Sequence, residues 1–289
     1  MKTLREYIKE ADEKGVAIGH FNISNLEALH GIYNAAKSLD LPVIIGVSEG
    51  EEAFVDTEVA VAMVKAIRET NNYPIFLNAD HHYSFEGVKK AIDAGFDSVI
   101  IDAVKLPYEE NVALTKKCVD YAKEVSQKTG RDILVEAELG FIGQSSKVLD
   151  KLPEGVSEET MTKPEEAKAF VDATGVDLLA PSVGNVHGIV TSGNPRLHPE
   201  RVKEIREAAG VPLVLHGGSG TMDDDFVACI GEGIDIVHIN TEIRVAYRDA
   251  IKKFLNENPN EVAPYKFLAP GVEAVEEVVR KRLKLFNKM

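Results

Sequence analysis

The sequence predicts an α/β protein of the (β/α)8 TIM-barrel class with a C-terminal helical extension, and three observations carry that prediction. Short runs rich in Val, Ile and Leu alternate along the chain with longer, charged segments of helical periodicity. Eight such units fit into 289 residues, a usual length for one barrel. Nearly every run ends on a polar side chain that can bind a ligand, as barrel strands do at their catalytic end.

The eight apolar runs are the expected strands, and they lie at residues 16–22, 42–48, 74–80, 98–103, 133–139, 178–183, 212–218 and 236–242. Each is short and aliphatic, as strands that are covered on both faces are. Because strands alternate with helical segments, we expect right-handed βαβ units and a parallel sheet. A doubly wound open sheet is the alternative, although no G-x-G-x-x-G follows any of the runs.

The segments between the runs have the pattern of amphipathic helices. In residues 25–39 one stripe is apolar and consists of Leu26, Leu29, Ile32 and Ala36. Gly175 is placed to end the helix that precedes the sixth strand. The final segment, residues 271–286, is also amphipathic and predicts the helical extension, packed either on the barrel or on a partner subunit.

We expect a single domain over residues 1–289, because no interdomain linker or low-complexity tract interrupts the alternation. Residues 140–163 break the rhythm, since they are polar and have no clear period. A loop of that length inside a compact domain is usually an active-site lid or a disordered segment. The sequence therefore predicts a mobile active-site loop at about 140–163.

Composition argues against several kinds of partner. The formal net charge of −14 argues against nucleic acid, which attracts basic surfaces, although a local pocket can still accept a small anion. The charged start "MKTLREYIKEADEKG" does not read as a signal peptide, and no apolar run approaches the roughly 18 residues of a membrane span. Cys118 and Cys229 have no metal-type spacing. We therefore expect a cytoplasmic protein without nucleic-acid or membrane partners.

The polar residues at the ends of the runs form the candidate site, and they are Asn22, Ser48, Asp80, His81, Asp102, Glu136, Glu138, His187, His216, His238 and Asn240. The carboxyl ends of parallel barrel strands meet at one face, so these side chains are expected to converge. The carboxylates suit metal ligands, orienting groups or a general base. The alternative is a structural network of ion pairs inside the barrel.

Three of the eight histidines stand out. His81, His187 and His216 each follow an apolar run, and three imidazoles at an open-mouthed site suit a catalytic zinc ion. His82 is expected to face away, because neighbouring residues of a strand point to opposite faces. The other histidines at positions 20, 30 and 198 fit ordinary surface or core roles.

The segment "HGGSG" at residues 216–220 is a glycine-rich turn after the seventh expected strand, and "NTE" follows the eighth. Glycine permits a backbone in which several N–H groups approach one anion. Barrels frequently bind phosphate at this place. The alternative is an ordinary turn between strand and helix, which also favours Gly and Ser.

Several segments together resemble one family, the class II, zinc-dependent ketose-bisphosphate aldolases. The matching segments appear in family order and are "FNISNLEAL", "PVIIGVSEG", "ADHHYSFEGVKKAIDAGFDSVIIDA", "LPYEEN", "VEAELGFIG", "GNVHG" and "VLHGGSG". The resemblance covers almost the whole chain, and each motif falls on the strand end that the barrel prediction assigns to it.

The resemblance implies reversible aldol cleavage of a ketose 1,6-bisphosphate, foremost fructose 1,6-bisphosphate, to dihydroxyacetone phosphate and glyceraldehyde 3-phosphate. It implies Zn²⁺ as the Lewis acid, a possible second metal position, a monovalent cation, a phosphorylated sugar as the partner molecule, and a homodimer or homotetramer. A tagatose-bisphosphate aldolase, or an aldolase for another aldehyde, is the nearest alternative. A zinc-dependent phosphosugar hydrolase or isomerase and a non-catalytic sugar-phosphate-binding protein are the others.

The family's functional residues fall on named positions here. The resemblance implies that Asp80 moves the proton of the substrate C4 hydroxyl and that Glu154 on the loop is a second acid. It places zinc on His81, His187 and His216, and a second metal on Asp102 and Glu138. It places the substrate and its phosphate on Asn22, Ser48, Gly188, Gly217, Gly218, Ser219, His238, Asn240 and Thr241.

The sequence departs from the family pattern in three places. His238 and Asn240 stand where the family commonly has Asn and Asp. Tyr265 stands where the family often has an arginine, reached from a neighbouring subunit, that grips the phosphate of the aldehyde half. Lys266 lies beside it as a cation without a bidentate fork. The loop reads "GQSSK" where an acidic cluster is usual, and its acids come only later. These departures leave the aldehyde half of the substrate open.

Overall fold

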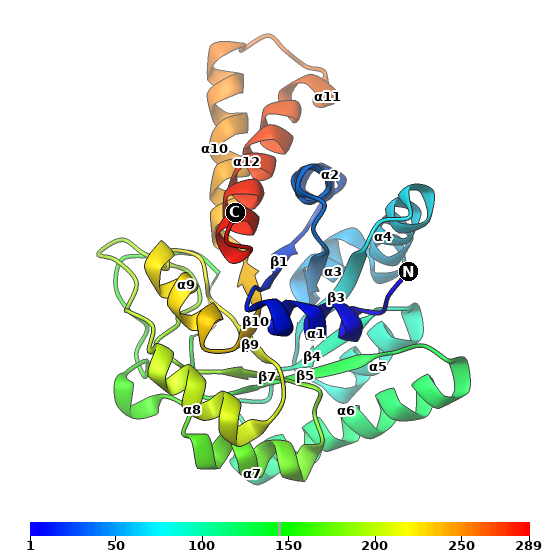
Figure 1. The fold of residues 1–289 in the computed structure, drawn as a ribbon. Coiled ribbons are helices and arrows are strands. Elements are labelled where there is room, and N and C mark those ends of the chain that lie inside the picture. The colour runs from blue at the N-terminus through cyan, green and yellow to red at the C-terminus, as the bar shows by residue number, and fades with distance from the viewer. Residues whose placement is uncertain (144–145) are drawn as a thin grey trace.

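A computed structural model describes residues 1–143 and 146–289 and has the closed barrel that the sequence predicts (Figure 1). Positions 144 and 145 of the predicted loop lie outside the described residues. Eight parallel strands close the barrel, in the order β1 (Ile18–Asn22), β2 (Val43–Ser48), β3 (Ile75–His82), β4 (Ser98–Ile101), β5 (Leu134–Leu139), β7 (Leu178–Pro181), β9 (Leu213–Leu215) and β10 (Ile234–Ile239).

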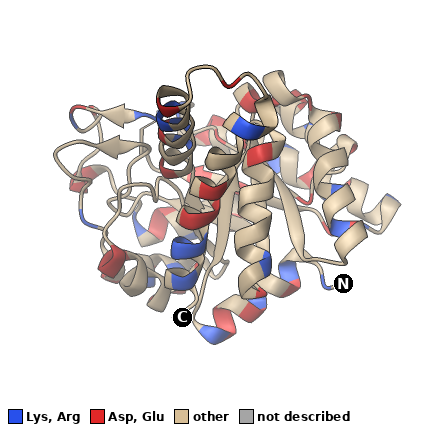
Figure 2. Ribbon diagram, turned by 90° about the horizontal axis from the view of Figure 1, so that it is seen from above, with Lys and Arg blue, Asp and Glu red and all other residues tan. Residues whose placement is uncertain are grey.

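Helices return the chain between the strands and surround the barrel. They are α2 (Leu26–Leu39), α4 (Thr57–Asn71), α5 (Phe85–Ala94), α6 (Tyr108–Thr129), α7 (Pro164–Thr174), α8 (Pro199–Ala209) and α9 (Asp223–Gly231). Seen from above, their charged residues carry both signs, interspersed along the helices (Figure 2). Among the described residues, no helix combines the length and the apolar character that crossing a membrane requires.

The predicted helical extension is present. After β10 the chain forms α10 (Thr241–Glu257), α11 (Pro264–Phe267) and α12 (Ala269–Phe286). The helices α10 and α12 lie side by side and project beyond the barrel, and α12 also packs along α2 (Figure 1). Val275, Val279 and Leu283 on α12 are buried, so its apolar stripe covers the barrel as one of the two predicted packings requires.

The loop at 140–163 contains regular structure. A short strand β6 (Val148–Leu149) pairs in parallel with β8 (Ile189–Val190), and a 3-10 turn covers Glu158–Thr160. The sequence shows no period there because two residues are too few to display one. This small sheet ties the loop to the segment that follows β7.

The helix ends follow from local chemistry. Thr3 and Asn25 cap α1 (Leu4–Lys14) and α2 with side-chain oxygens that accept backbone N–H bonds. Gly175 has a φ of 65° and ends α7, as its sequence position predicts. A short helix, α3 (Glu49–Val55), directly follows β2 and begins at the N-cap Ser48.

Alternate strand residues point into the barrel and form three levels, because side chains two apart on a strand share a face. The lowest level is apolar and buried: Ile18, Ile44, Phe76, Leu134, Leu178, Val214 and Ile236. The middle level is polar and buried: His20, Asn78, Ser98, Glu136, His216 and His238. The upper level contains the predicted site residues: Asn22, Ser48, Asp80, Asp102, Glu138 and Asn240.

Helix α1 closes the lower end of the barrel. Leu4, Ile8 and Ala11 are buried and form one cluster with the lowest level of barrel side chains. A separate and larger cluster fills the space between the barrel and the surrounding helices. The barrel interior is therefore an apolar plug at the amino end, and its polar side chains lie at the middle and upper levels.

A repeated aspartate clasp joins neighbouring strands at the amino end. The sequence Gly-apolar-Asp occurs at 95–97, 175–177 and 233–235, each time with a glycine of positive φ after a helix. The three aspartates are Asp97, Asp177 and Asp235. Each accepts the backbone N–H of the preceding strand, at Leu77, Val135 and Leu213, over 2.8 to 3.0 Å.

Each clasp aspartate is also paired with an arginine. Arg68 binds Asp97, Arg5 of α1 binds Asp177, and Arg206 of α8 binds Asp235. Burial raises the pKa of Asp235 to about 7 even though Arg206 acts to lower it. Arg206 therefore offsets only part of the cost of burying the Asp235 carboxylate inside the lower rim.

Replacing Arg206 tests this clasp. Arg206→Ala leaves Asp235, which is 1% exposed, without its cation, so we expect the free energy of unfolding to fall by about 3 kcal/mol or more. The matched control is Lys203→Ala on the same helix, whose exposed pair with Glu232 is 3.9 Å long, with an expected loss within about 0.5 kcal/mol. Denaturant unfolding measures both. A loss of stability in Arg206→Ala that is as small as the loss in Lys203→Ala would show that the clasp contributes no stability.

Candidate active site

A backbone irregularity in β3 places two consecutive residues on the same side. His81 has a φ of 50°, a left-handed conformation that is uncommon outside glycine, and the pairing of β3 with β4 shifts register between Ala79 and His82. As a result both Asp80 and His81 line the cavity at the mouth of the barrel. His82 turns outward instead, and its Nε2 lies 3.1 Å from Glu52.

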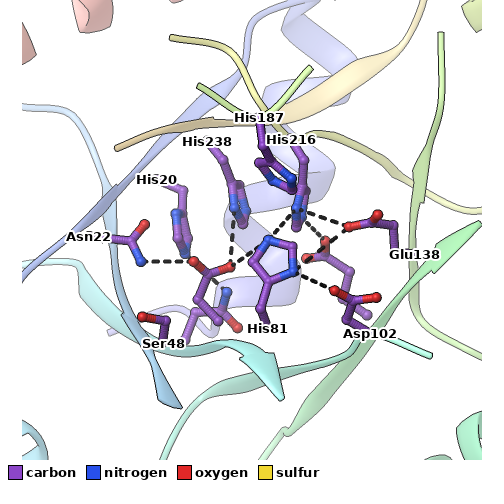
Figure 3. Close-up of polar contacts among 12 residues, drawn as sticks. His20, Asn22, Ser48, His81, Asp102, Glu138, His187, His216 and His238 are labelled. Atoms are coloured by element: carbon purple, nitrogen blue, oxygen red, sulfur yellow. Dashed lines mark hydrogen bonds and ion pairs between the residues drawn. The ribbon is translucent and has the colours of Figure 1, made fainter. Parts of the chain in front are cut away.

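The three histidines that the sequence singles out converge (Figure 3). His81 Nε2 lies 3.1 Å from His216 Nδ1, and the rings of His81 and His187 meet edge to face with centroids 4.8 Å apart. One nitrogen of each ring and one oxygen of Glu138 all lie within 4.8 Å of one another. Three strand ends and one loop therefore deliver four metal-type ligand atoms to one point.

The second nitrogen of each ring faces an oxygen. His81 Nδ1 lies 3.0 Å from Asp102 Oδ2, His187 Nδ1 donates to the carbonyl of Gly143 over 2.7 Å, and His216 Nε2 lies 2.7 Å from Glu136. Such partners orient the rings of metal-binding histidines. This leaves Nε2 of His81, Nε2 of His187 and Nδ1 of His216 as the inward ligand atoms.

The protonation preferences fit a cation at this point. Burial lowers the pKa of His187 and of His216 to about 3, so both rings are neutral and present lone pairs. Burial also acts to lower the pKa of His81, but neighbouring carboxylates led by Asp80 outweigh it and raise the pKa to about 10. His81 therefore carries a second proton here, which a bound metal ion would replace.

Glu138 and Asp102, predicted as a second metal position, lie on the same side of His81. Glu138 Oε2 is 3.8 Å and Asp102 Oδ2 is 3.0 Å from His81 Nδ1. Glu138 Oε2 is buried, lacks a hydrogen-bond partner among the described residues, and lies 3.6 Å from His216 Nδ1. An unpartnered carboxylate oxygen beside three imidazoles is a donor set that suits zinc, so the residues present fit the ion.

Asp80 has the surroundings of a general base. Its Oδ2 accepts a hydrogen bond from Asn22 Nδ2 over 2.8 Å, and its Oδ1 lies 3.6 Å from His238 Nδ1. Burial alone would raise the pKa of Asp80, but His81 and His238 outweigh it and hold the pKa well below its usual value. The carboxylate is therefore ionised and is aimed by its neighbours into the cavity.

His238 belongs to a column of three stacked imidazoles. Its ring lies 3.5 Å from that of His20, nearly parallel, and 4.1 Å from that of His216. Gly46 makes room for His20, because a Cβ there would lie 2.2 Å from the His20 ring. The sequence assigns His20 an ordinary role, and the structure places it directly behind His238, where it supports that ring.

The glycine-rich turns line one end of the cavity. Gly188, Gly217 and Ser219 line it, together with Asn240 and Thr241 from the start of α10. Gly217 has a φ of 63°, and a Cβ there would lie 2.5 Å from the carbonyl oxygen of Val186. Backbone groups therefore approach each other here more closely than any other residue type permits.

Gly218 supports the turn from behind. It does not line the described cavities, and its N–H donates to the carbonyl of His238 over 3.1 Å. A Cβ at Gly218 would lie 2.8 Å from that same oxygen. Of the two glycines in "HGG", one therefore faces the cavity and the other fastens the turn to β10.

An adjoining cavity of about 210 Å3 contains a cation that the sequence analysis missed. It is lined by Ser48, Tyr83, Asp102 and Arg244, among others, and it shares Asp80, His81, His187 and Asn240 with the glycine-rich end. Arg244 lies on α10, one turn after Asn240 and Thr241. The signal was available, because a residue four after a strand-end asparagine on the following helix returns to the same face.

Two residues that the resemblance singled out lie away from these cavities. Tyr265 is 76% exposed on α11, and Glu154 is exposed in the loop. Neither lines the two described cavities around Asp80. Arg244 lines the second of these cavities, and the contact expected from a neighbouring subunit's segment at 264–267 stays a prediction.

Comparison with known proteins identifies the family of this chain. A model of the family described as fructose-bisphosphate aldolase class-II matches residues 2–289. Fructose-bisphosphate aldolases from Staphylococcus aureus strain Mu50 and from Geobacillus stearothermophilus are each 39% identical over 288 residues, which is 99% of this chain and 96% of each relative.

A solved structure has the same fold. The YdjI aldolase from Escherichia coli K12 superposes with a TM-score of 0.82 at 34% identity, covering 98% of this chain and 96% of that one. The match spans the barrel and the extension, so it is not a likeness of the barrel alone. On the strength of the family match along its length, this chain belongs to the class-II fructose-bisphosphate aldolase family and is a lyase of that class.

Proposed function

We propose that this chain reversibly cleaves fructose 1,6-bisphosphate to dihydroxyacetone phosphate and glyceraldehyde 3-phosphate. The observation that carries the proposal is the convergence of three imidazoles beside an ionised Asp80. The names of the relatives support fructose as the sugar. Tagatose 1,6-bisphosphate differs from it only in the configuration at C4. A cleavage assay is therefore needed to decide which of the two sugars is the substrate.

His81, His187 and His216 are the residues that we propose to hold zinc, with Glu138 adjoining them. Zinc when bound supplies a Lewis acid for the ketose carbonyl and the charge that stabilises the developing enediolate. We assign a second, alternate metal position to Asp102 and Glu138, whose carboxylates both lie near His81 Nδ1. A monovalent cation, a homodimer or homotetramer, and a cytoplasmic location remain part of the proposal from the family resemblance.

The chain's own residues move the proton and hold the sugar. Asp80 takes the proton of the C4 hydroxyl as the C3–C4 bond breaks, and Asn22 keeps its carboxylate in line. The turn of Gly188, Gly217 and Ser219 faces one phosphate with backbone N–H groups. We propose Glu154 as the acid that returns a proton to the carbanion carbon, which requires the loop at 140–163 to close over the cavity.

Arg244 is the residue that we propose for the second phosphate. It lines the distal part of the cavity, and its planar guanidinium suits a phosphate better than an ammonium group does. The sequence expectation for Tyr265 and Lys266 concerns a contact from a neighbouring subunit and stays a separate prediction. The contact of Arg244 requires no residue from a partner subunit.

Removing the base tests its role. Asp80→Ala is expected to keep zinc and to lose turnover by about 100-fold or more, because the carboxylate that takes the C4 proton is removed. Steady-state cleavage coupled to metal analysis measures both quantities. Activity within a few-fold of the unaltered protein would exclude Asp80 as the base.

Removing a metal ligand tests the zinc site. His216→Ala is expected to purify without zinc, since it deletes one of three ligands and exposes Glu136 unpaired. The control is His30→Ala, an exposed histidine on α2, which is expected to keep full occupancy. Elemental analysis decides, and full zinc in His216→Ala would refute the assignment.

Substrate identity is tested by cleavage of fructose 1,6-bisphosphate and tagatose 1,6-bisphosphate side by side, with and without a zinc chelator. We expect chelator-sensitive cleavage with the fructose substrate preferred. Activity that persists after the metal is removed would contradict a metal-dependent mechanism, and a preference for tagatose would reassign the sugar.

Replacing the distal cation tests its contact with the second phosphate. Arg244→Gln is expected to raise KM for fructose 1,6-bisphosphate by about 10-fold or more, because a charged hydrogen bond to phosphate is lost. The control is Arg248→Gln, which lies one turn further along α10 and pairs with its neighbour Asp249. An unchanged KM in Arg244→Gln would place the second phosphate elsewhere.

A further inference from the structure

Glu51 connects the two ends of the candidate site, although no motif draws attention to it. It lies on the short helix α3 and is only 6% exposed. Its Oε2 accepts hydrogen bonds from Asn22 Nδ2 over 2.9 Å and from the hydroxyl and the backbone N–H of Ser48 over 2.8 Å each. Its Oε1 pairs with Arg244.

We propose that Glu51 is a specificity-determining residue, which sets how strongly the enzyme prefers a phosphate to a hydroxyl at the distal end of its substrate. The inference rests on the proposed aldol cleavage and on Arg244 as the distal cation. It concerns a carboxylate that has no assigned part in the chemistry, and it follows from the contacts of both carboxylate oxygens.

The first step of the argument is charge. Arg244 is the cation that lines the distal cavity within the described residues, and in this structure its guanidinium is paired with Glu51. A distal phosphate must share that guanidinium with a carboxylate of like charge, whereas a distal hydroxyl does not meet this repulsion. Glu51 therefore reduces the advantage of a phosphorylated aldehyde over one without phosphate.

The second step is position. Asn22 Nδ2 donates to both Glu51 Oε2 and Asp80 Oδ2, over 2.9 and 2.8 Å. The amide is thus held between the two carboxylates, and Glu51 fixes the group that aims the base. Loss of Glu51 Oε2 should slow the cleavage of every substrate alike, because it disturbs Asp80 and leaves the contact between Arg244 and the distal phosphate in place.

The third step separates these effects from a structural one. Glu51 is also the N3 residue of the capping box that begins α3, so its removal weakens a short helix. Glutamine preserves one oxygen for Ser48 and Asn22 and turns an N–H donor toward Arg244, which breaks the ion pair and keeps the cap. Glu51→Gln and Glu51→Ala therefore test charge and position separately.

The experiment compares kcat/KM for fructose 1,6-bisphosphate with that for fructose 1-phosphate, in the zinc-loaded full chain. In Glu51→Gln we expect this ratio to rise by about 10-fold, since one like charge is removed near the phosphate. In Glu51→Ala we expect the same rise in the ratio together with a fall in kcat of about 10-fold for both substrates.

The matched control is Glu52→Gln, the neighbouring buried glutamate of α3. It binds Thr57 and His82 and contacts neither Asn22 nor Arg244 in the described structure. The substrate ratio is expected to stay unchanged there. A change of equal size in Glu52→Gln would show that α3 acts only through its own stability and would overturn the proposal.

A double replacement keeps the test decisive if a single variant is unstable. In the Arg244→Gln background, Glu51 faces the phosphate without a cation, so adding Glu51→Gln should raise the lowered ratio. If fructose 1,6-bisphosphate is still cleaved and the substrate ratio is unchanged in both Glu51→Gln and this double variant, the inference is refuted. If the unaltered protein cleaves neither compound, the proposed function itself fails.

Discussion

The chemistry of this site depends on one strained residue. In a regular strand Asp80 and His81 would point to opposite faces, and only one could reach the cavity. The left-handed backbone of His81, with the register shift beside it, turns both inward. A non-glycine residue in that region costs about 1 to 2 kcal/mol, which the contacts of its ring to Asp102 and His216 offset.

Much of the fold could be predicted from the sequence because the relevant signals are local. The aliphatic runs end within a few residues of the observed strands, and Gly175 ends α7 as a positive-φ glycine should. Polar side chains at strand ends converge because the carboxyl ends of all strands in a parallel barrel lie at the same face. The convergence of His81, His187 and His216 follows from that constraint, and the structure has it.

Other parts could not be predicted, because they depend on contacts between distant segments. Regular alternation along β3 would turn Asp80 and His82 to one face and His81 to the other. Only the bulge at His81 brings Asp80 and His81 together and turns His82 outward. His20 has no signal of its own, and its place behind His238 depends on Gly46 of the next strand. Arg244 and Glu51 are 193 residues apart in sequence and meet only through the closed barrel.

The clasps at the amino end also bear on the order in which the barrel assembles. Arg68 and Asp97, like Arg206 and Asp235, are separated by 29 residues, so each pair closes within a single repeat unit. Arg5 and Asp177 are 172 residues apart and join the first helix to the second half of the chain. Because closing a long loop costs more entropy than closing a short one, the local clasps can form early as independent nuclei. By the same argument, we expect the docking of α1 to be a late step in assembly.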